Sequence, residues 1–188
     1  MIRCPWAISE ISTNYHDMEW GVPLHADQKL FEFLILEGAQ AGLNWETILK
    51  KRAAYQNAFA NFEPARIAQF DANQVEKLLN NPGIIRNRRK IESAIQNAAV
   101  FIKIQEEFNS FNQYVWGFVD GKPIQNNFHH FSEVPAETEL SRRLSKDLKQ
   151  RGMSFVGPTI MYAFMQAIGM VNDHLVECYR FNEINQME

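Results

Sequence analysis

Both cysteines of this chain lie near a histidine in sequence, one pair toward each end. Cys4 and His16 form the first pair, and His174 and Cys178 form the second. Two cysteines and two histidines are the ligand set of a closed tetrahedral zinc site. The second pair is spaced by four, so on a helix its members would share one face, whereas the first pair is expected on a loop and a short turn. The spacing therefore indicates a metal site that joins the two ends of the chain.

Two other interpretations of these four residues stay open at this point. A buried structural cysteine or a hydrogen-bonded core histidine is commoner than a metal ligand. A disulfide between Cys4 and Cys178 would also use both thiols. The disulfide is disfavoured because the first ten residues, MIRCPWAISE, lack the apolar segment of a secretory signal.

Length and composition predict a single domain over residues 1–188 with a substantial core, since 46% of the residues are hydrophobic. No stretch approaches the length of a membrane span, so we expect no membrane partner and a bacterial-type cytoplasmic location. The formal net charge of −3 argues against a protein that coats DNA without specificity, but it allows a local basic face. Basic clusters occur at residues 50–52, at residues 86–90, and at Lys146, Lys149 and Arg151. Solvated helix ends are the alternative interpretation of each cluster.

Helical periodicity dominates the chain, and no strand pattern of comparable strength appears, so the predicted fold is mostly or wholly α-helical. Several predicted helices have a recognisable start: Asp27 before residues 29–37, Asn44, Pro64, Asp71 with Gln74, and a long helix after Arg88. Residues 110–118 are expected to be helical, and residues 120–134 are expected to form a loop.

A helix, a tight turn and a second helix are predicted in the last third of the chain. Residues 136–150 form a charged amphipathic pattern that stops at Gly152, and Pro158 can start a helix over residues 159–168. The intervening residues 154–157 leave room only for a tight hairpin. Such a helix-hairpin-helix element can present backbone N–H groups to a phosphate. An ordinary pair of antiparallel helices in a bundle is the alternative.

Long motifs along the chain resemble those of the DNA-3-methyladenine glycosylase I family, within the helix-hairpin-helix DNA glycosylase superfamily. The resemblance runs from Arg3 to about Cys178. It is carried by RCPW at 3–6, YHDMEWGVP at 15–23, LEGAQAGLNWETILKKR at 36–52, NPGIIRNRRKI at 81–91 and LSKDLKQRGMSFVGPTIMYAFMQAIGMVNDH at 144–174. It implies an all-α bundle with a helix-hairpin-helix at about 136–170.

The resemblance also implies one structural Zn²⁺, because members of the family hold zinc with two cysteines and two histidines near their termini. Those positions match Cys4, His16, His174 and Cys178. The ion would join the terminal segments 1–26 and 171–188. Four protein ligands leave no open position, so the ion would not be catalytic.

The implied activity is that of a monofunctional glycosylase, typically a monomer, which hydrolyses the N-glycosidic bond of 3-methyladenine in alkylated double-stranded DNA and releases the free base. Such an enzyme takes the base out of the stack, and its pocket needs aromatic faces to hold that base. The candidates within the matching motifs are Trp6, Tyr15, Trp20 and Trp45. Each of these, taken alone, could instead be a core residue.

Glu37 is the candidate catalytic residue. It ends an apolar run just before the segment Gly-Ala-Gln-Ala-Gly, where a turn is expected and a carboxylate without a partner is costly. In the family, the matching glutamate contacts the amino edge of the flipped methylated adenine. A carboxylate there favours a cationic base and repels the O6 acceptor of guanine. A capping or ion-paired glutamate is the alternative.

The expected DNA contacts come from two turns. The resemblance implies that Leu43 fills the gap left by the flipped base. The hairpin is expected to hold the phosphate backbone, and the basic residues before it add positive charge; together these are Phe155, Val156, Gly157, Lys146, Lys149 and Arg151.

Most members of the wider superfamily carry a catalytic aspartate shortly after the hairpin element. Asn172 occupies the comparable place in this chain, and the 3-methyladenine family shares the absence. N3-methylation makes the base cationic, so that it departs neutral and strong acid catalysis is unnecessary. Asp173 remains a candidate for positioning the attacking water.

Overall fold

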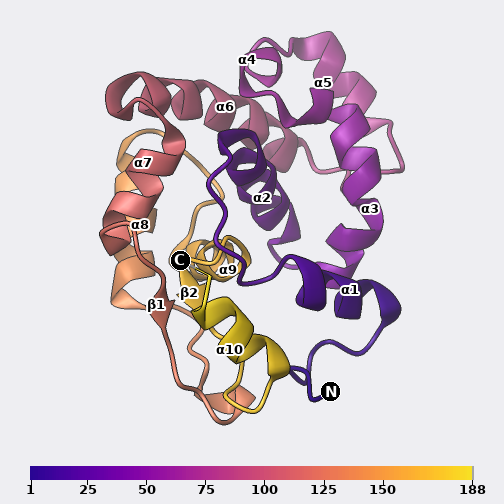
Figure 1. Ribbon diagram of the computed structural model, residues 1–188. Coiled ribbons are helices and arrows are strands. Elements are labelled where there is room, and N and C mark those ends of the chain that lie inside the picture. The colour runs from indigo at the N-terminus through magenta and orange to yellow at the C-terminus, as the bar shows by residue number, and fades with distance from the viewer. Residues whose placement is uncertain (188) are drawn as a thin grey trace.

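Helices make up most of the computed structural model, which describes residues 1–187. Glu188, the last residue of the predicted domain, lies outside the described residues. The α-helices are α1 Glu10–Met18, α2 Asp27–Gln40, α3 Trp45–Ala58, α4 Pro64–Ile67, α5 Ala72–Leu79, α6 Arg88–Phe108, α7 Phe111–Trp116, α8 Glu139–Gln150, α9 Pro158–Ala167 and α10 Tyr179–Asn185 (Figure 1). Short 3-10 turns occur at Ala60–Phe62, Gly117–Val119 and Phe131–Glu133.

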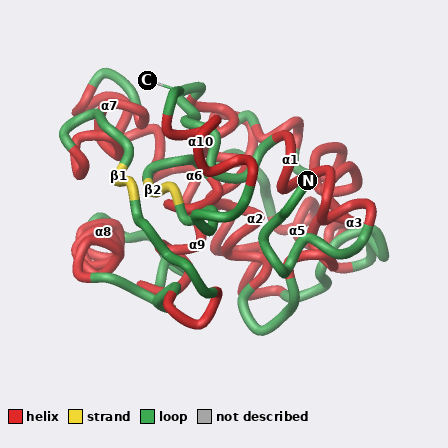
Figure 2. The backbone as a smooth tube through the Cα atoms, turned by 60° about the horizontal axis from the view of Figure 1, so that its bottom comes forward, coloured by secondary structure: helices red, strands yellow, loops and turns green. Residues whose placement is uncertain are grey.

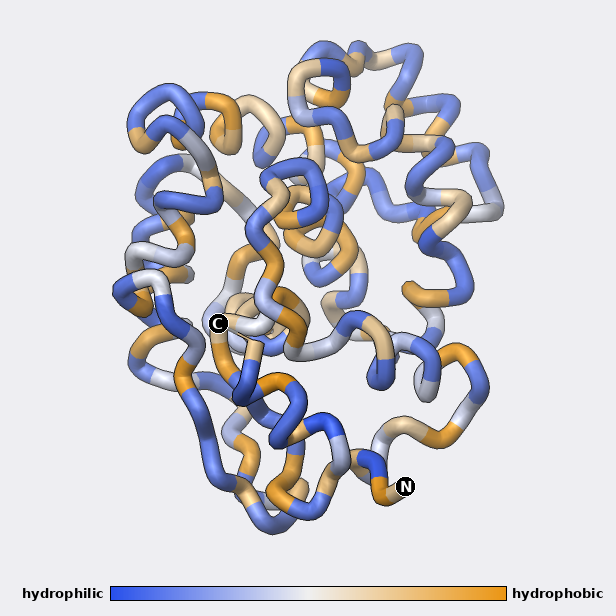
Figure 3. The backbone as a smooth tube through the Cα atoms, viewed as in Figure 1, coloured by the Kyte–Doolittle hydropathy of each residue, from blue (hydrophilic) through white to orange (hydrophobic). Residues whose placement is uncertain are grey.

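Helix α2 lies at the centre of the molecule. Ten of its fourteen residues are buried, and it contacts α3, α6, α7 and α9. Only three of the fourteen residues of α3 are buried. A helix that is apolar on all sides belongs in a core, and a helix with a narrow apolar stripe belongs at the edge. Figure 3 accordingly shows orange, hydrophobic stretches in the centre, where α2 and α9 lie, and blue stretches along outlying helices such as α3.

Several helix starts follow the local signals in the sequence. The Asn44 side chain accepts from the backbone N–H of Thr47 at 2.8 Å, and Asp71 accepts from that of Gln74 at 2.8 Å. Pro64 occupies the first turn of α4. These three predicted starts are confirmed. Each depends on groups within three residues, so the local sequence is enough to predict it.

Helix α2 begins at Asp27, but the prediction that the Asp27 side chain caps this helix is wrong. The N-cap of α2 is Ala26, which has no side-chain capping bond. The Asp27 carboxylate instead accepts from the backbone N–H groups of Phe111 and Asn112, at 2.9 and 2.8 Å. Those groups open α7 and need an acceptor, so Asp27 caps a helix more than eighty residues away.

A small parallel sheet interrupts the predicted all-helical fold. β1 Ile124–Gln125 pairs with β2 Val171–Asn172, and Ile124 lies opposite Val171. Figure 2 shows the two yellow strands side by side. The expected loop over residues 120–134 therefore contains a strand and a 3-10 turn. Two-residue strands give no periodic signal, so local pattern could not reveal this pairing.

The predicted helix, tight turn and helix lie at residues 139–167. Helix α8 ends near Gly152, whose φ of +102° is the left-handed conformation that glycine favours. Helix α9 begins at Pro158 and packs against α8. The turn also lies close to α2, since a Cβ on Gly38 would be 3.4 Å from the Cβ of Phe155.

The two ends of the described chain meet. The backbone N–H of Tyr179, at the start of α10, donates to the carbonyl of Ile2 at 3.1 Å. Figure 1 shows the indigo N-terminal segment next to α10. Within residues 1–187, none of the helices combines the length and the apolar character that crossing a membrane requires.

Candidate active site and metal-binding cluster

A cavity of about 450 Å³ lies between the N-terminal segment, α2, α3 and α9. One wall is aromatic and is formed by the four residues that the sequence suggested, namely Trp6, Tyr15, Trp20 and Trp45. The Trp6 and Trp20 rings lie edge to face with centroids 5.0 Å apart, and the centroids of Tyr15 and Trp45 are 5.4 Å apart. The structure thus brings all four aromatic candidates to one cavity.

Glu37 lies at this cavity, near the C-terminal end of α2. The expected turn directly after it is wrong, because the helix continues to Gln40 and keeps the carboxyl group inside the protein. Its side chain is 3% exposed, and its Oε2 atom has no hydrogen-bond partner among residues 1–187. Burial raises the pKa of Glu37 to about 8. The free pocket therefore holds a mostly neutral carboxyl group at pH 7.

Two aromatic residues of the same cavity, Tyr15 and Trp45, carry polar atoms of their own. The indole Nε1 of Trp45 is buried without a partner in the described part of the chain. Burial, followed by the charge of Glu37, raises the pKa of Tyr15 well above its usual value. Buried polar atoms without partners are costly. An indole donor and a carboxyl oxygen left free in one cavity are therefore suited to a ligand with its own donors and acceptors.

The opposite side of the cavity was not predicted. The loop after β1 contributes Phe131, Val134, Pro135 and Ala136. No local signal could have placed this loop at the cavity, because the β1–β2 pairing across 46 intervening residues holds it there.

Helix α9 also contributes to the cavity. Its lining residues are Thr159, Tyr162, Ala163 and Gln166. Their spacing of i, i+3, i+4 and i+7 is that of one helical face, so a search for polar residues on one face of α9 could have found them. Gln40, on α2, was also missed.

Asp173 lines the cavity and Asn172 does not. The Asp173 carboxylate accepts from Asn126 at 2.7 Å, from the Tyr162 hydroxyl at 2.6 Å and from Gln166 at 2.7 Å. The Asn172 amide instead donates to the backbone carbonyl of Phe181 at 3.1 Å. Successive residues of a strand point to opposite sides, so β2 turns Asn172 away and the residue after it toward the cavity.

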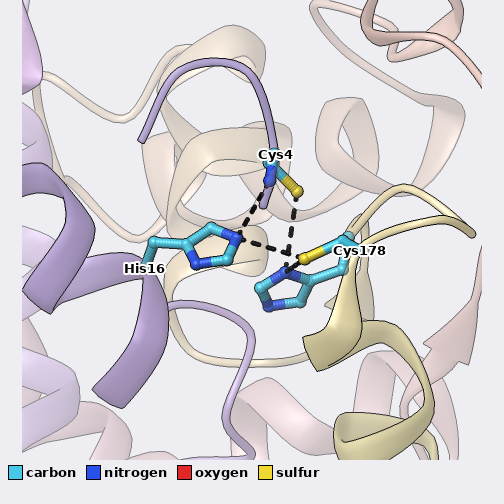
Figure 4. Close-up of side chains that lie close together, drawn as sticks. Cys4, His16 and Cys178 are labelled. Atoms are coloured by element: carbon cyan, nitrogen blue, oxygen red, sulfur yellow. Dashed lines mark hydrogen bonds between the residues drawn. The ribbon is translucent and has the colours of Figure 1, made fainter. Parts of the chain in front are cut away.

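The four Cys and His residues form a buried cluster next to this cavity. Their ligand atoms all lie within 4.8 Å of one another. Cys178 Sγ is 3.4 Å from His16 Nε2 and 3.6 Å from His174 Nδ1, and Cys4 Sγ is 3.7 Å from His174 Nδ1. Figure 4 shows Cys4, His16 and Cys178 converging on one point. Both cysteines are free thiols, which rules out the disulfide alternative in this structure.

The backbone around these residues differs from the prediction. His174 and Cys178 do not share a helical face, because α10 begins only at Tyr179 and Cys178 is its N-cap. His16 lies on α1 rather than on a short turn, and Cys4 lies on a loop as expected. The structure brings the four predicted residues together, but the elements that carry them depend on tertiary packing.

Neighbouring groups orient both imidazole rings. His16 Nδ1 lies 2.8 Å from the Asp17 carboxylate, which is also bound by Arg3. His174 Nε2 lies 3.0 Å from the carbonyl oxygen of Trp20. In each ring the other nitrogen faces the cluster, the arrangement typical of histidine ligands with an outer hydrogen-bond acceptor.

The geometry of the cluster fits a tetrahedral metal ion. Sulfur and nitrogen atoms bound to one zinc at about 2.3 and 2.0–2.1 Å lie about 3.6 Å apart, close to the three measured distances. The interaction between the two cysteine side chains raises the pKa of the Cys4 thiol and lowers that of the Cys178 thiol. Two thiolates this close together would need a cation between them.

The predicted DNA contacts lie on two turns outside the cavity. Leu43 projects from the turn between α2 and α3 and is 41% exposed. In the other turn, Phe155 has a φ of +55° and Val156 is fully buried. Gly157 is the N-cap of α9.

The basic residues before that second turn have different surroundings. Lys146 and Lys149 are exposed and line a surface depression beside Pro158. Arg151 pairs with Glu107 at 2.6 Å and with Asp147 at 2.6 Å. Its charge is therefore neutralised within the protein, and the expectation that it adds to a basic face is not supported by its pairing.

Comparisons with known proteins agree with this geometry. Residues 6–181 match the family described as methyladenine glycosylase. DNA-3-methyladenine glycosylase from Haemophilus influenzae is 46% identical over 177 residues, which cover 94% of this chain and 96% of that protein. DNA-3-methyladenine glycosylase 1 from Escherichia coli is 46% identical over 179 residues, with 95% and 96% covered.

A solved structure of 3-methyladenine DNA glycosylase I from Staphylococcus aureus, described for its recognition of 3-methyladenine, superposes with a TM-score of 0.92. It is 38% identical, and the match covers 94% of this chain and 95% of that one. The likeness extends over nearly the whole length in both sequence and fold, and the chain belongs to the methyladenine glycosylase family.

Proposed function

We propose that this protein is a monofunctional DNA glycosylase that hydrolyses the N-glycosidic bond of 3-methyladenine in alkylated double-stranded DNA and so initiates base excision repair. The observation that carries the proposal is the cavity itself, an aromatic pocket in which the Glu37 carboxyl group has a free oxygen. The relatives named for this activity support it.

The pocket chemistry suits a methylated adenine that has left the stack. Aromatic faces stack on a base with a gain of about 1–3 kcal/mol, and they attract a cationic base further. Tyr15 packs against Trp45 and Trp6 packs against Trp20, and these two pairs form the aromatic wall of the cavity that Glu37 also lines. An ionised Glu37 accepts a hydrogen bond from the exocyclic amino group and repels the O6 of guanine.

The charge of the base and the state of Glu37 are coupled. In the free pocket burial holds the pKa of Glu37 at about 8, and a cationic base entering the pocket favours the ionised form. Binding of the cationic base thus supplies the positive partner that stabilises an ionised Glu37 in the desolvated pocket. The base then departs as a neutral molecule, so a strong acid is not required. The Asp173 carboxylate, held by three donors at the cavity, remains the candidate for positioning the attacking water.

The Cys4–His16–His174–Cys178 cluster is proposed to bind one Zn²⁺. With four protein ligands the ion would be structural. These residues would tie segment 1–26 to segment 171–188 and keep Trp20, whose carbonyl lies against His174, at the pocket wall. The donor set and the spacing of the ligand atoms support this assignment.

Two turns are proposed to contact the DNA. Leu43 would fill the gap left by the flipped base, and its exposure on the α2–α3 turn supports this role. The α8–turn–α9 unit would act as a helix-hairpin-helix: the backbone of Phe155, Val156 and Gly157 would hold phosphates, and Lys146 and Lys149 would add positive charge. A single domain acting as a monomer would suffice for these contacts.

Base release from alkylated duplex DNA tests the proposal. Wild-type protein and Glu37→Gln are incubated with the DNA, and the free bases are separated by chromatography. We expect 3-methyladenine from the wild type and a loss of about two to four orders of magnitude in the variant. Glu46→Gln is the matched control, because Glu46 is paired with Lys50 on the surface of α3.

Each outcome separates one part of the proposal from another. Release that survives in Glu37→Gln would keep the enzyme and remove Glu37 from its mechanism. No release from folded, zinc-loaded wild type would contradict the activity and favour a protein that binds damaged bases without turnover.

A further inference from the structure

The turn between α2 and α3, residues 41–44, is largely exposed. Gly42 has a φ of +77°, and a Cβ added there would meet no atom within 4 Å among the described residues. The next residue, Leu43, donates its backbone N–H to the Gln40 carbonyl at 2.6 Å. Its side chain is therefore held near the tip of a turn that points into open space.

A lysine from a distant helix fixes the beginning of this turn. The Lys90 ammonium, in the first turn of α6, donates to the carbonyl of Ala39 at 2.8 Å and to that of Ala41 at 2.6 Å. The last carbonyls of a helix lack partners within the helix and form its negative end. One ammonium group thus satisfies two carbonyls of the α2 terminus, 51 and 49 residues away in sequence.

The other end of the turn has its own anchor. The Asn44 side chain accepts from the backbone N–H and the hydroxyl of Thr47, at 2.8 and 2.7 Å, and so begins α3. Leu43 is the one residue between the two anchors whose side chain is both apolar and exposed. The turn is therefore pinned on either side of the residue proposed to enter the DNA.

We propose that Lys90 is a positioning residue for DNA binding, which holds the α2–α3 turn in one conformation so that Leu43 is presented before the protein meets the duplex. The inference rests on the proposed role of Leu43. A turn that is ordered in advance does not lose conformational entropy on binding, and this raises affinity without adding a contact. Lys90 commits two of its donors to carbonyl groups, so it acts through the turn rather than as a free phosphate contact.

A double-mutant cycle tests this inference. Lys90→Met, Leu43→Ala and the double variant are compared with wild type in steady-state base release from a duplex with one lesion, with kcat and KM measured separately. We expect Lys90→Met to lower kcat/KM roughly tenfold, the order expected for loss of a charge-assisted anchor. In the Leu43→Ala background the same change should have little effect, because both substitutions remove one function.

Two further measurements distinguish loss of the positioned turn from a general disruption of the protein fold. Binding of free 3-methyladenine, followed by tryptophan fluorescence, should be unchanged in Lys90→Met, because the pocket itself is intact. Lys90→Arg keeps a cationic donor and should recover most of the activity. Lys90→Gln, which has a shorter neutral side chain and loses the charge, is the test variant if Lys90→Met does not fold, and the same roughly tenfold loss is expected.

The salt dependence of DNA binding identifies a phosphate contact. Loss of one such contact would lower the slope of log K against log salt by about 1, and we expect no such change in Lys90→Met. Arg89→Met removes the neighbouring exposed charge and leaves the two Lys90 hydrogen bonds to the end of α2 in place, so it reports the effect of charge alone.

Three results would overturn the inference. The first is a loss of kcat/KM in Arg89→Met equal to that in Lys90→Met, and the second is a loss on Lys90→Met that is equally large with Leu43 and with Ala at position 43. The third is unchanged kcat/KM in Lys90→Met. Wild-type activity in Leu43→Ala is a separate failure, since it contradicts the proposed role of Leu43 itself. Absence of base release from the wild type would instead contradict the proposed function.

Discussion

Replacing Glu37 with glutamine should stabilise the free protein at neutral and alkaline pH, while it impairs base release. The carboxyl group has a pKa of about 8 in the folded chain, against 4.5 for the ordinary side chain. Between these values the folded protein holds a proton that the unfolded chain has lost, so the free energy of unfolding falls as the pH rises. Glutamine is neutral throughout and avoids this loss.

The size of the effect follows from the two pKa values. Each unit of difference corresponds to about 1.4 kcal/mol. At pH 7, roughly 2.5 pH units above the pKa of the unfolded side chain, ionisation stabilises the unfolded state relative to the folded state by about 3 kcal/mol. Above pH 8 this stabilisation of the unfolded state reaches about 5 kcal/mol. Below pH 4.5 both forms are neutral, and wild type and Glu37→Gln should be equally stable within about 1 kcal/mol.

Urea denaturation of both proteins at several pH values from 4.5 to 9 measures this difference. The expected gap between the two curves opens with rising pH and levels off above pH 8. Glu46→Gln is again the control, because the ion pair with Lys50 lowers the pKa of Glu46 and its removal should not stabilise the protein. Parallel pH profiles for wild type and Glu37→Gln, or a less stable variant at pH 8, would refute the reasoning.

The other predictions concern the metal cluster and one close backbone contact. Cys178→Ser should lower both the zinc content and Tm; an unchanged melting curve with full zinc content would contradict a structural ion. Asp17→Asn should weaken zinc binding by about 10- to 100-fold in a chelator competition, because Asp17 orients His16; equal affinity would remove it from the site. Gly169→Ala should cost more than about 2 kcal/mol in urea unfolding, since φ is +75° and the new Cβ would lie 2.5 Å from the Val22 carbonyl carbon; normal stability would show that the backbone yields there.

Short-range features of this protein could be predicted from its sequence. The starts of α3 and α5 depend on Asn44 and Asp71, whose side chains bind backbone groups three residues away. The end of α8 at Gly152 and the start of α9 at Pro158 have equally local causes. Residue types also indicated which Cys and His residues cluster and which four aromatic residues line the cavity, because a zinc site and a base pocket each require a restricted chemistry.

Tertiary structure decided the features that depend on partners far along the chain. Asp27 caps α7 instead of its own helix, and Lys90 caps α2 from the start of α6. The loop carrying Phe131 reaches the cavity only because β1 pairs with β2. Glu37 has its raised pKa because the packed chain buries its carboxyl group. Hydrogen-bond partners and desolvation are properties of the packed chain, whereas helix caps and ligand types are properties of short segments. For this reason sequence alone indicated which residues could do the chemistry, and only packing determined their protonation and orientation.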